Sequence, residues 1–450
     1  MLLVFPALDL FGGDNLPHEH ARELEVVDQI LCANPIVTRL VWKDLQDEEG
    51  PVLDRRGRPG LSADVVLRAA IIKQMKGFSY EELAFHLADS LTYRRFCGFT
   101  HPLDVPRKSA LAKNIRRICE ATWQSANQVI LQYAEVRGIE DGHKVRIDAT
   151  VTESNIHHPT DSALLFDSVR TLSRILGRAR AGFAIASANR CKAAKRRHMA
   201  IINAKRNAHR IKPYRDLLKL TEETIRYAAQ AIERLHQVSG PMAGVAQRLA
   251  RELEHYIPLA QQVVSQTRRR VLNAERVPAN EKIVSIFEPH TDIIRKDRRD
   301  TYYGHKVTLT GGVSGLVLDW VVEQGNPADS TLLIRMLERQ RDQYGRYPRQ
   351  ASVDGGYASK DNLRSAKALG VEDMVFSKKC GLKVEDMVTQ SWLFKRLRDF
   401  RAGIEGVISF LKRVFGLRRC TWRGQPSFAR YVGASIVSAN LLILARHLML

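Results

Sequence analysis

Cysteine is scarce in this chain, with 6 cysteines among 450 residues and no two of them in a C-x-x-C arrangement. The wide spacing argues against a disulfide framework and against a thiolate zinc site, and it fits a reducing compartment such as the cytoplasm. The six positions are Cys32, Cys97, Cys119, Cys191, Cys380 and Cys420.

Four common catalytic motifs are missing as well. The sequence has no phosphate-binding loop (GxxxxGK followed by Ser or Thr), no dinucleotide-binding GxGxxG, no HExxH and no GxSxG. ATP-driven enzymes, dinucleotide-dependent oxidoreductases, zinc proteases and serine hydrolases are therefore disfavoured.

Long apolar segments are also lacking. Tyr431–Ala445 is apolar for 15 residues between two arginines but includes Asn440, so it is too short for a bilayer span and predicts a buried core helix. Met1–Gly13 is apolar but has no basic residues and contains Asp9, which does not fit a signal peptide. We expect a cytoplasmic protein with no membrane partner.

Acidic residues are outnumbered. The chain has 70 Lys and Arg against 49 Asp and Glu, a formal net charge of +21, and such an excess predicts binding to a polyanion, most commonly nucleic acid. An anionic membrane surface and a ribosomal type of basicity are the competing interpretations. Between Asp167 and Asp216 there are 14 Lys and Arg and no acid. The alternatives there are a solvated helical surface and a nucleic-acid contact, for which Lys195, Arg196 and Arg197 are candidates.

Helical signals dominate the first third of the chain. Residues 1–60 are mixed and end in a polar stretch that indicates a linker. Residues 61–140 are predicted to form a helical domain. Ser62 is placed as a helix N-cap, Gly77 stops that helix, and Ser79 with Glu82 forms a capping box for the next. This arrangement resembles a helix-turn-helix DNA-binding motif, although any helical bundle contains such turns. A third helix is predicted from Ser109 to about Val136.

The pattern changes to strands at Lys144, where apolar and polar residues alternate through Thr150. Residues 141–450 are predicted to be a catalytic α/β domain with a mixed sheet, interrupted by a basic helical insertion at about 163–280. The remaining elements expected are a hairpin at 305–310 and 316–322, helices at 329–341, 359–369 and 398–415, and strands at 350–353 and 374–376.

Three acids occupy positions where chemistry could occur. Asp148 projects from the first strand, Asp354 follows a later strand just before two glycines, and Glu405 lies on a helix. Ligands gather at the carboxyl edge of α/β sheets, so the two aspartates could share a site with Glu405 packed over it. Carboxylate oxygens suit Mg²⁺, and three of them can hold two ions about 3.5–4 Å apart. Each acid taken alone is more often a surface charge or a turn residue.

The helix around Glu405 adds cations to that constellation. Arg398, Arg401, Glu405 and Lys412 share one helical face. The alternatives are a surface Arg401–Glu405 ion pair worth about 0.3–0.5 kcal/mol and a metal-binding Glu flanked by cations that hold DNA phosphates. Trp392 and Trp422 could stack on bases, although core packing is the more frequent fate of tryptophan.

In combination these residues resemble the bacterial insertion-sequence transposases, which carry a DDE triad on a ribonuclease H-like fold. The resemblance covers most of the chain from about Leu61 onward. Arg401, Glu405 and Lys412 match the family signature Arg-x3-Glu-x6-Lys, with Arg398 at its preceding Tyr position. The other matching segments are Phe78–Leu83, Tyr93–Phe99, Arg146–Thr150, His158–Asp161, Tyr303–Val307 and Val353–Tyr357.

The resemblance implies that Asp148, Asp354 and Glu405 are catalytic ligands of Mg²⁺ or Mn²⁺, two ions in all, and that Arg401 and Lys412 contact DNA at the cleaved end. It further implies a transposase that binds terminal inverted repeats, cleaves the element ends and joins the 3′-hydroxyl to target DNA, as a homodimer or higher oligomer on double-stranded DNA. The alternatives are a standalone metal-dependent nuclease of the same fold, a catalytically decayed DNA-binding relic and an RNA-binding structural protein.

Overall fold

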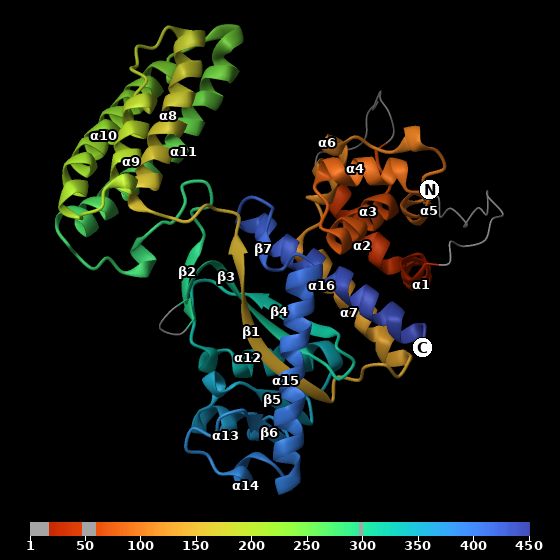
Figure 1. The fold of residues 1–450 in the computed structure, drawn as a ribbon. Helices are drawn as coiled ribbons and strands as arrows, with labels where there is room; N and C mark the ends of the chain where they lie inside the picture. The colour runs from red at the N-terminus through yellow and green to blue at the C-terminus, as the bar shows by residue number, and fades with distance from the viewer. Residues whose placement is uncertain (1–17, 47–59, 297–299) are drawn as a thin grey trace. The chain divides into compact units, whose positions relative to one another are not determined.

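The computed structural model describes residues 18–46, 60–296 and 300–450. The chain divides into two compact units, one formed by residues 1–153 with 305–450 and the other by residues 154–304. Figure 1 shows the elements of each unit. The predicted linker before Gly60 lies outside the described residues, as does Met1–Gly13.

The first unit begins with helices. Their bounds are α1 Glu19–Ala33, α2 Pro35–Leu45, α3 Ala63–Lys76, α4 Tyr80–Asp89, α5 Leu91–Cys97, α6 Lys108–Ile115 and α7 Glu120–Val136. Two of them, α1 and α2, fall where the sequence predicted only a mixed segment. In α1 the buried residues Leu24, Val27 and Leu31 recur at the spacing of an amphipathic helix, so the sequence carried a helical signal that the prediction missed. Burial of such residues, and of Val41 in α2, stabilises the two helices.

The predicted caps of α3 and α4 are confirmed. Ser62 accepts from the backbone N–H of Val65, and Gly77 ends α3 with a φ of 67°, a left-handed conformation that glycine adopts without strain. Ser79 and Glu82 form the capping box of α4. The single helix predicted from Ser109 to Val136 is wrong, because the chain breaks between α6 and α7.

The break before α7 has a physical cause. The backbone N–H of Cys119 donates to the Asp44 carboxylate at 2.8 Å, and the Cys119 sulfur accepts from the N–H of Thr122 as the N-cap of α7. Both interactions hold Cys119 in an extended conformation that a continuous helix does not allow. No local sequence pattern encodes the contact with Asp44, which is 75 residues away.

One mixed sheet of seven strands forms within the described residues. Its order is β2-β3-β1-β5-β6, with β4 paired to β3 and β7 paired to β1. Strands β1, β5 and β6 are parallel, whereas β3 pairs antiparallel with β2 and β4. The bounds are β1 Lys144–Ser154, β2 Asp292–Lys296, β3 Asp300–Gly311, β4 Val317–Val322, β5 Gln350–Val353, β6 Asp373–Phe376 and β7 Arg419–Cys420.

This architecture confirms the predicted α/β fold class, including the hairpin β3–β4 and the strand β5. The later helices are α12 Leu333–Tyr344, α13 Lys360–Ala368, α14 Val384–Met387, α15 Ser391–Val414 and α16 Gln425–Leu448. Helix α15 starts seven residues before its predicted beginning, and α12 follows a separate 3-10 turn at Asp329–Thr331.

Helix α16 is the predicted core helix of the C-terminal region. It is long and apolar enough to cross a membrane by length and composition, and 83% of its most apolar window is buried. It packs on α1, α3 and α7. Asn440 within it is satisfied by polar groups, since its amide donates to Asn127 and to the carbonyl of Val317, both at 2.7 Å. These features are those of a core helix in a globular domain.

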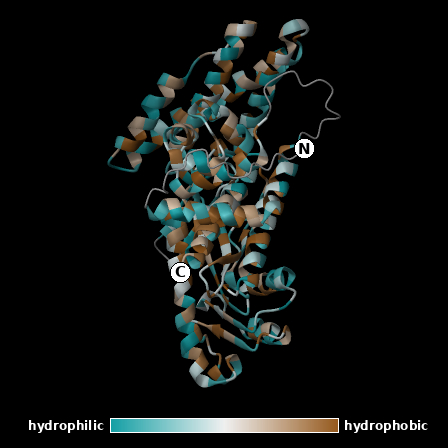
Figure 2. Ribbon diagram, turned by 90° about the vertical axis from the view of Figure 1, so that its right-hand side faces the viewer, coloured by the Kyte–Doolittle hydropathy of each residue, from teal (hydrophilic) through white to brown (hydrophobic). Residues whose placement is uncertain are grey.

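The second unit is built mainly from four helices, α8 Asp161–Phe183, α9 Cys191–Asn203, α10 Ala208–His236 and α11 Ala243–Thr267. Hydrophobic and hydrophilic residues alternate along the helices, as the brown and teal bands of Figure 2 show. The apolar faces of α8, α10 and α11 pack together in a core that includes Leu172, Leu235 and Leu253. The helical insertion was predicted to run to about residue 280. The last helix, α11, ends at Thr267 and is followed by a π turn through Leu272.

Candidate active site

The two aspartates lie on neighbouring parallel strands. In the register of β1 with β5, Ile147 pairs with Val353. Asp148 and Asp354 are the next residues after this pair, so they lie next to each other on the two strands. β5 ends at Val353 whereas β1 continues to Ser154. Asp148 therefore projects from the middle of a strand, and Asp354 starts the turn that follows its strand.

Helix α15 brings the third acid. Its buried residues Leu397, Ile404 and Leu411 dock it against β5 and β6 (Figure 1). This spacing of seven leaves Arg401 and Glu405 on an adjacent face of the helix. The Glu405 side chain is 65% exposed, compared with 17% for Asp148 and 43% for Asp354.

A single guanidinium gathers the three carboxylates. Arg401 Nη2 lies 3.2 Å from Asp148 Oδ2 and 3.7 Å from Asp354 Oδ1, while Arg401 Nη1 lies 3.1 Å from Glu405 Oε1. The Arg401 side chain is 16% exposed. The structure thus brings together Asp148, Asp354, Glu405 and Arg401, four residues that the sequence singled out.

The guanidinium offsets repulsion among the three negative charges. Without a cation between them, carboxylates this close would favour protonation of one of their number. Within the described ranges, no group of three or more His, Cys, Asp and Glu side chains is arranged tightly enough to hold a metal ion. The acids surround Arg401 instead of closing on one another, so Arg401 is the internal counter-ion of the site.

Asp354 is oriented by a serine that the sequence analysis missed. Ser377 follows β6, and its hydroxyl donates to Asp354 Oδ1 at 2.6 Å while accepting from the N–H of Gly355 at 2.9 Å. Partial burial opposes ionisation of Asp354, but the bonds from Ser377 and Gly355 and the charges of Arg401 and Lys378 outweigh it and lower the pKa of this carboxyl. Asp354 is consequently ionised at neutral pH.

A buried tyrosine lies in the electrostatic field of the acids. The Tyr357 side chain has no exposed surface, and its hydroxyl has no hydrogen-bond partner. Burial first, and then the negative charges of Asp329, Asp148, Glu323 and Asp354, raise its pKa. An unpartnered buried hydroxyl is a polar group that a bound ion or its water can satisfy.

Arg146 fixes α15 to the sheet. It lies two residues before Asp148 on β1, donates from Nη1 to the carbonyl of Phe400 at 3.0 Å, and packs over the Phe400 ring at 4.7 Å. Gly403 makes room for it, because a Cβ there would lie 2.0 Å from Arg146 Nη1. The alternating pattern of β1 placed Arg146 and Asp148 on the same face, yet it did not indicate that Arg146 is 7% exposed.

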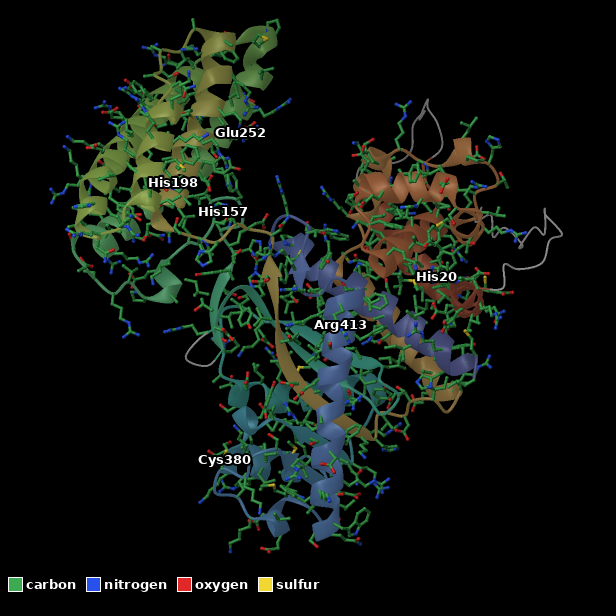
Figure 3. The ribbon with its side chains drawn as sticks, viewed as in Figure 1. His20, His157, His198, Glu252, Cys380 and Arg413 are labelled. Atoms are coloured by element: carbon green, nitrogen blue, oxygen red, sulfur yellow. The ribbon has the colours of Figure 1, made fainter. Side chains whose placement is uncertain are left out.

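The other residues of the predicted DNA-contact group are placed differently. Arg398 lies on α15, is 50% exposed and approaches Asp399 at 4.0 Å. Lys412 is half-buried and engaged by other groups. Arg413, labelled in Figure 3, is exposed near the end of the same helix. Trp392 is 54% exposed and available for stacking, whereas Trp422 is 4% exposed, which is the core packing that tryptophan more often adopts.

The basic stretch of the second unit has more acidic partners than the sequence suggested. Lys195 and Arg196 are exposed on α9, but Arg197 approaches Asp216 at 3.8 Å and Arg190 pairs with Glu223 at 3.1 Å. The stretch itself contains no acid, but folding packs acids of α10 against it. Figure 3 shows many nitrogen-tipped side chains over these helices.

Comparison with known families identifies the family of this chain. Residues 284–441 match the family described as Transposase DDE domain, and residues 18–117 match a second family, Transposase domain (DUF772). Together these matches span more than half of the chain. The chain belongs to the insertion-sequence DDE transposases. No curated protein and no solved structure matches it significantly.

The family assignment extends to the fold and to the general activity. A DDE domain has a ribonuclease H-like core, which the mixed sheet of this transposase fits, and DDE enzymes generally use divalent metal ions and bind DNA. The match to the DDE domain contains Asp354 and Glu405 but begins after Asp148. The match to the second family contains α1 and α2, the two helices that sequence patterns missed.

The acidic site suits a hard divalent cation. Its donors are carboxylate oxygens, the ligand type that Mg²⁺ and Mn²⁺ prefer. The cationic guanidinium of Arg401 already occupies the place where the three acids converge, and the Tyr357 hydroxyl is unpartnered. Residues of the right charge and donor type are therefore present for a metal ion.

Proposed function

We propose that this transposase binds the terminal inverted repeats of its own element, cleaves phosphodiester bonds at the element ends and joins the resulting 3′-hydroxyl to target DNA. Asp148, Asp354 and Glu405 would hold two Mg²⁺ or Mn²⁺ ions. The observation that carries the proposal is the convergence of these three acids, from β1, the end of β5 and α15, on one guanidinium.

Both reaction steps are in-line displacements at phosphorus, so one site serves both. The bound ions would supply Lewis acidity toward the attacking and leaving oxygens. Asp354 is suited to hold a cation because its pKa is lowered and Ser377 fixes its rotamer. Arg146 holds α15 on β1, which keeps Glu405 opposite the aspartates.

The cations of α15 would serve the DNA. With the acids engaged by metal ions, the planar fork of Arg401 would be available to hold a phosphate in a bidentate manner. Arg398 is exposed on the same helix and can reach the backbone of the same strand. Lys412 and the exposed Lys195 and Arg196 complete the proposed DNA contacts, together with Arg197.

The proposed partner is double-stranded DNA at the element ends and at the target site. Cleavage of two ends implies a homodimer or a higher oligomer on DNA. We propose a cytoplasmic, nucleoid-associated location, for which the charge of +21 and the free cysteines are the support.

The first test uses purified protein with a supercoiled plasmid that carries the gene and its native flanking DNA. Breaks are mapped by sequencing after addition of Mg²⁺ or Mn²⁺, and joined products are scored separately from nicks. Asp354→Asn and Asp148→Asn are expected to lower cleavage by at least about a thousandfold, a loss of about 4 kcal/mol in transition-state stabilisation, without lowering DNA binding. The matched control is Asp361→Asn. Asp361 is 87% exposed on α13, and its ion pair is with Arg364 of the same helix.

The outcomes separate the alternatives. Boundary breaks and joined products that require both metal and Asp354 support a transposase, whereas nicks without joining identify a nuclease. Tight binding without breaks identifies a DNA-binding relic. Equal cleavage by Asp354→Asn would show that the site assignment is wrong.

A further inference from the structure

Helix α6 presents a one-sided basic surface. Leu111 and Ile115 are fully buried and dock the helix on the unit beneath it. The opposite face carries exposed Lys108, Ser109 and Lys113. Between residues 105 and 119 the sequence has five Lys and Arg and no acid, so this face attracts an anion along its whole length.

The spacing on that face matches what a helix presents to a groove. Lys108, Ala112 and Arg116 succeed one another at intervals of four, with Ser109 and Lys113 beside them, which places all five side chains on one side of the helix. Ser109 and Ala112 are small and lie between the cations. Small side chains allow the helix backbone to approach base edges while the longer basic side chains reach the flanking phosphates.

The neighbouring helices are unsuited to this role. In the helix-turn-helix expected from the sequence, α4 would be the recognition helix, but its exposed positions are Glu81, Glu82, Phe85 and Asp89, and three carboxylates would repel the DNA backbone. Helix α3 is buried along nearly its whole length. The helix-turn-helix assignment to α3 and α4 is therefore not supported by their surfaces.

The contacts of Lys108 and Arg116 with their neighbours do not neutralise the positive charge of α6. Lys108 pairs with Glu81 at 2.9 Å, but the two side chains are 59% and 78% exposed, and such pairs are worth less than about 1 kcal/mol. Arg116 packs over the Tyr80 ring at 5.4 Å. Its carbonyl accepts from Arg430 Nη1 at 2.7 Å, which brings a further cation from α16 to the end of α6.

We propose that α6 is the recognition helix of this transposase and that its Lys108, Ser109, Lys113 and Arg116 face enters the major groove of the element's end DNA. The inference rests on the proposed function, in that it requires DNA ends as the substrate. It assigns phosphate contacts to Lys108 and Lys113, and base contacts to Ser109 and Arg116.

The test compares full-length variants in equilibrium binding to two labelled duplexes of equal length, one from the DNA flanking the gene and one of unrelated sequence. Lys113→Gln is expected to weaken binding to both duplexes and to reduce the slope of log affinity against log salt by about 0.9, the value for one lost phosphate contact. Ser109→Val should reduce only the preference for the flanking duplex, by about tenfold. Arg364→Gln is the matched control, since Arg364 is 79% exposed on α13.

A charge change on α4 distinguishes the two helices. Glu81→Gln frees Lys108 and is expected to leave binding equal or tighter, whereas loss of binding in this variant would make α4 the recognition helix and overturn the proposal. Unchanged affinity, preference and salt slope in Lys113→Gln and Ser109→Val would also overturn it. Preferential binding to RNA of the same sequence would do so as well.

The result separates this inference from the proposed function. If the wild-type protein binds neither duplex, DNA-end recognition itself fails. If the wild type prefers the flanking duplex and the α6 variants retain that preference, only the assignment to α6 fails. Both substituted residues are exposed, so circular dichroism and thermal melting should match wild type.

Discussion

Arg401 contacts one carboxylate from each of three segments and is the residue on which the site depends. Without metal, the Arg401 guanidinium stabilises the three acids. On the proposed function it would also compete with a metal ion for the same carboxylates. Ser377 acts on the site indirectly, by donating a hydrogen bond to Asp354. At this scale the chemistry is decided by charge balance within one cluster of side chains.

Arg401→Gln should strengthen metal binding and weaken cleavage. The variant loses the internal counter-ion, so the three acids repel one another in the metal-free protein and bind a divalent or lanthanide ion about tenfold more tightly, a gain of about 1.4 kcal/mol. Terbium luminescence and the Mn²⁺-induced rise in melting temperature measure this directly. Arg398→Gln on the same helix is the control. Weaker terbium binding by Arg401→Gln would mean that Arg401 orders the acids and does not compete for them.

Ser377→Ala should weaken metal binding by about 10- to 100-fold, the usual cost of removing a group that orients a ligand. The lost hydroxyl bond of 2.6 Å frees the Asp354 rotamer and removes the Ser377 acceptor of the Gly355 N–H. Ser377→Thr keeps the hydroxyl and is expected to restore binding. If terbium titrations of Ser377→Ala and wild type coincide, Ser377 has no positioning role.

At the scale of elements, the crossing of α16 over α7 is the tightest contact between helices that the glycines reveal. A Cβ on Gly433 would lie 2.7 Å from Trp123 Cβ and 3.1 Å from its Cγ. Trp123 is fully buried, and these atoms are near its backbone, so the ring has little freedom to withdraw.

Gly433→Ala should therefore destabilise the first unit by about 1–3 kcal/mol, the range for overpacking a core. Urea unfolding followed by circular dichroism and by tryptophan fluorescence measures the loss. Gly177→Ala is the contrasting variant, because that glycine lies inside α8 with nothing within 4 Å of a built Cβ. It should gain about 0.5–1 kcal/mol from helix propensity. Equal stability of Gly433→Ala and wild type would show that the two helices separate at little cost.

Elements defined by local signals were predictable from the sequence. The capping box at Ser79, the strand before Asp354 and the hairpin β3–β4 match because caps, alternation and turn glycines act over a few residues. Helices α1 and α2 were missed although Leu24, Val27 and Leu31 of α1 have helical spacing. The break before α7 could not be predicted, because it depends on the distant Asp44.

The predicted acids could be named from the sequence, but their arrangement could not. Periodicity placed Arg401 and Glu405 on one helical face, and the parallel strands suggested that Asp148 and Asp354 would be neighbours. The bridging position of Arg401 depends on how α15 docks on the sheet, which Arg146 and Phe400 determine. Ser377 carries no motif, so only the adjacency of β5 and β6 reveals it.

For the whole molecule, the excess of positive charge governs association. A net charge of +21 is spread over both compact units, on α6, α9 and α15 among other elements. Neutralising several phosphates at once releases the counter-ions of DNA and makes affinity strongly dependent on salt.

DNA affinity should fall by about a thousandfold or more between 50 and 200 mM salt, as for proteins with six or more phosphate contacts. Fluorescence anisotropy with a labelled duplex of unrelated sequence gives the slope. Asp354→Asn should have the same slope as wild type, because the slope reports contacts of Lys and Arg with phosphates and this substitution removes no Lys or Arg. A slope near zero would mean that the basic surface does not contact the phosphate backbone.

Asp148 and Arg401 touch each other although 253 residues separate them along the chain. At a synthesis rate of about 5–20 residues per second, roughly 13 to 50 seconds pass between the appearance of the two on the ribosome. A growing chain therefore acquires α6 well before it can assemble the acids. Helix α16, on which α1, α3 and α7 pack, emerges later still. On the function proposed above, DNA binding and cleavage would therefore mature together, once the chain is nearly complete.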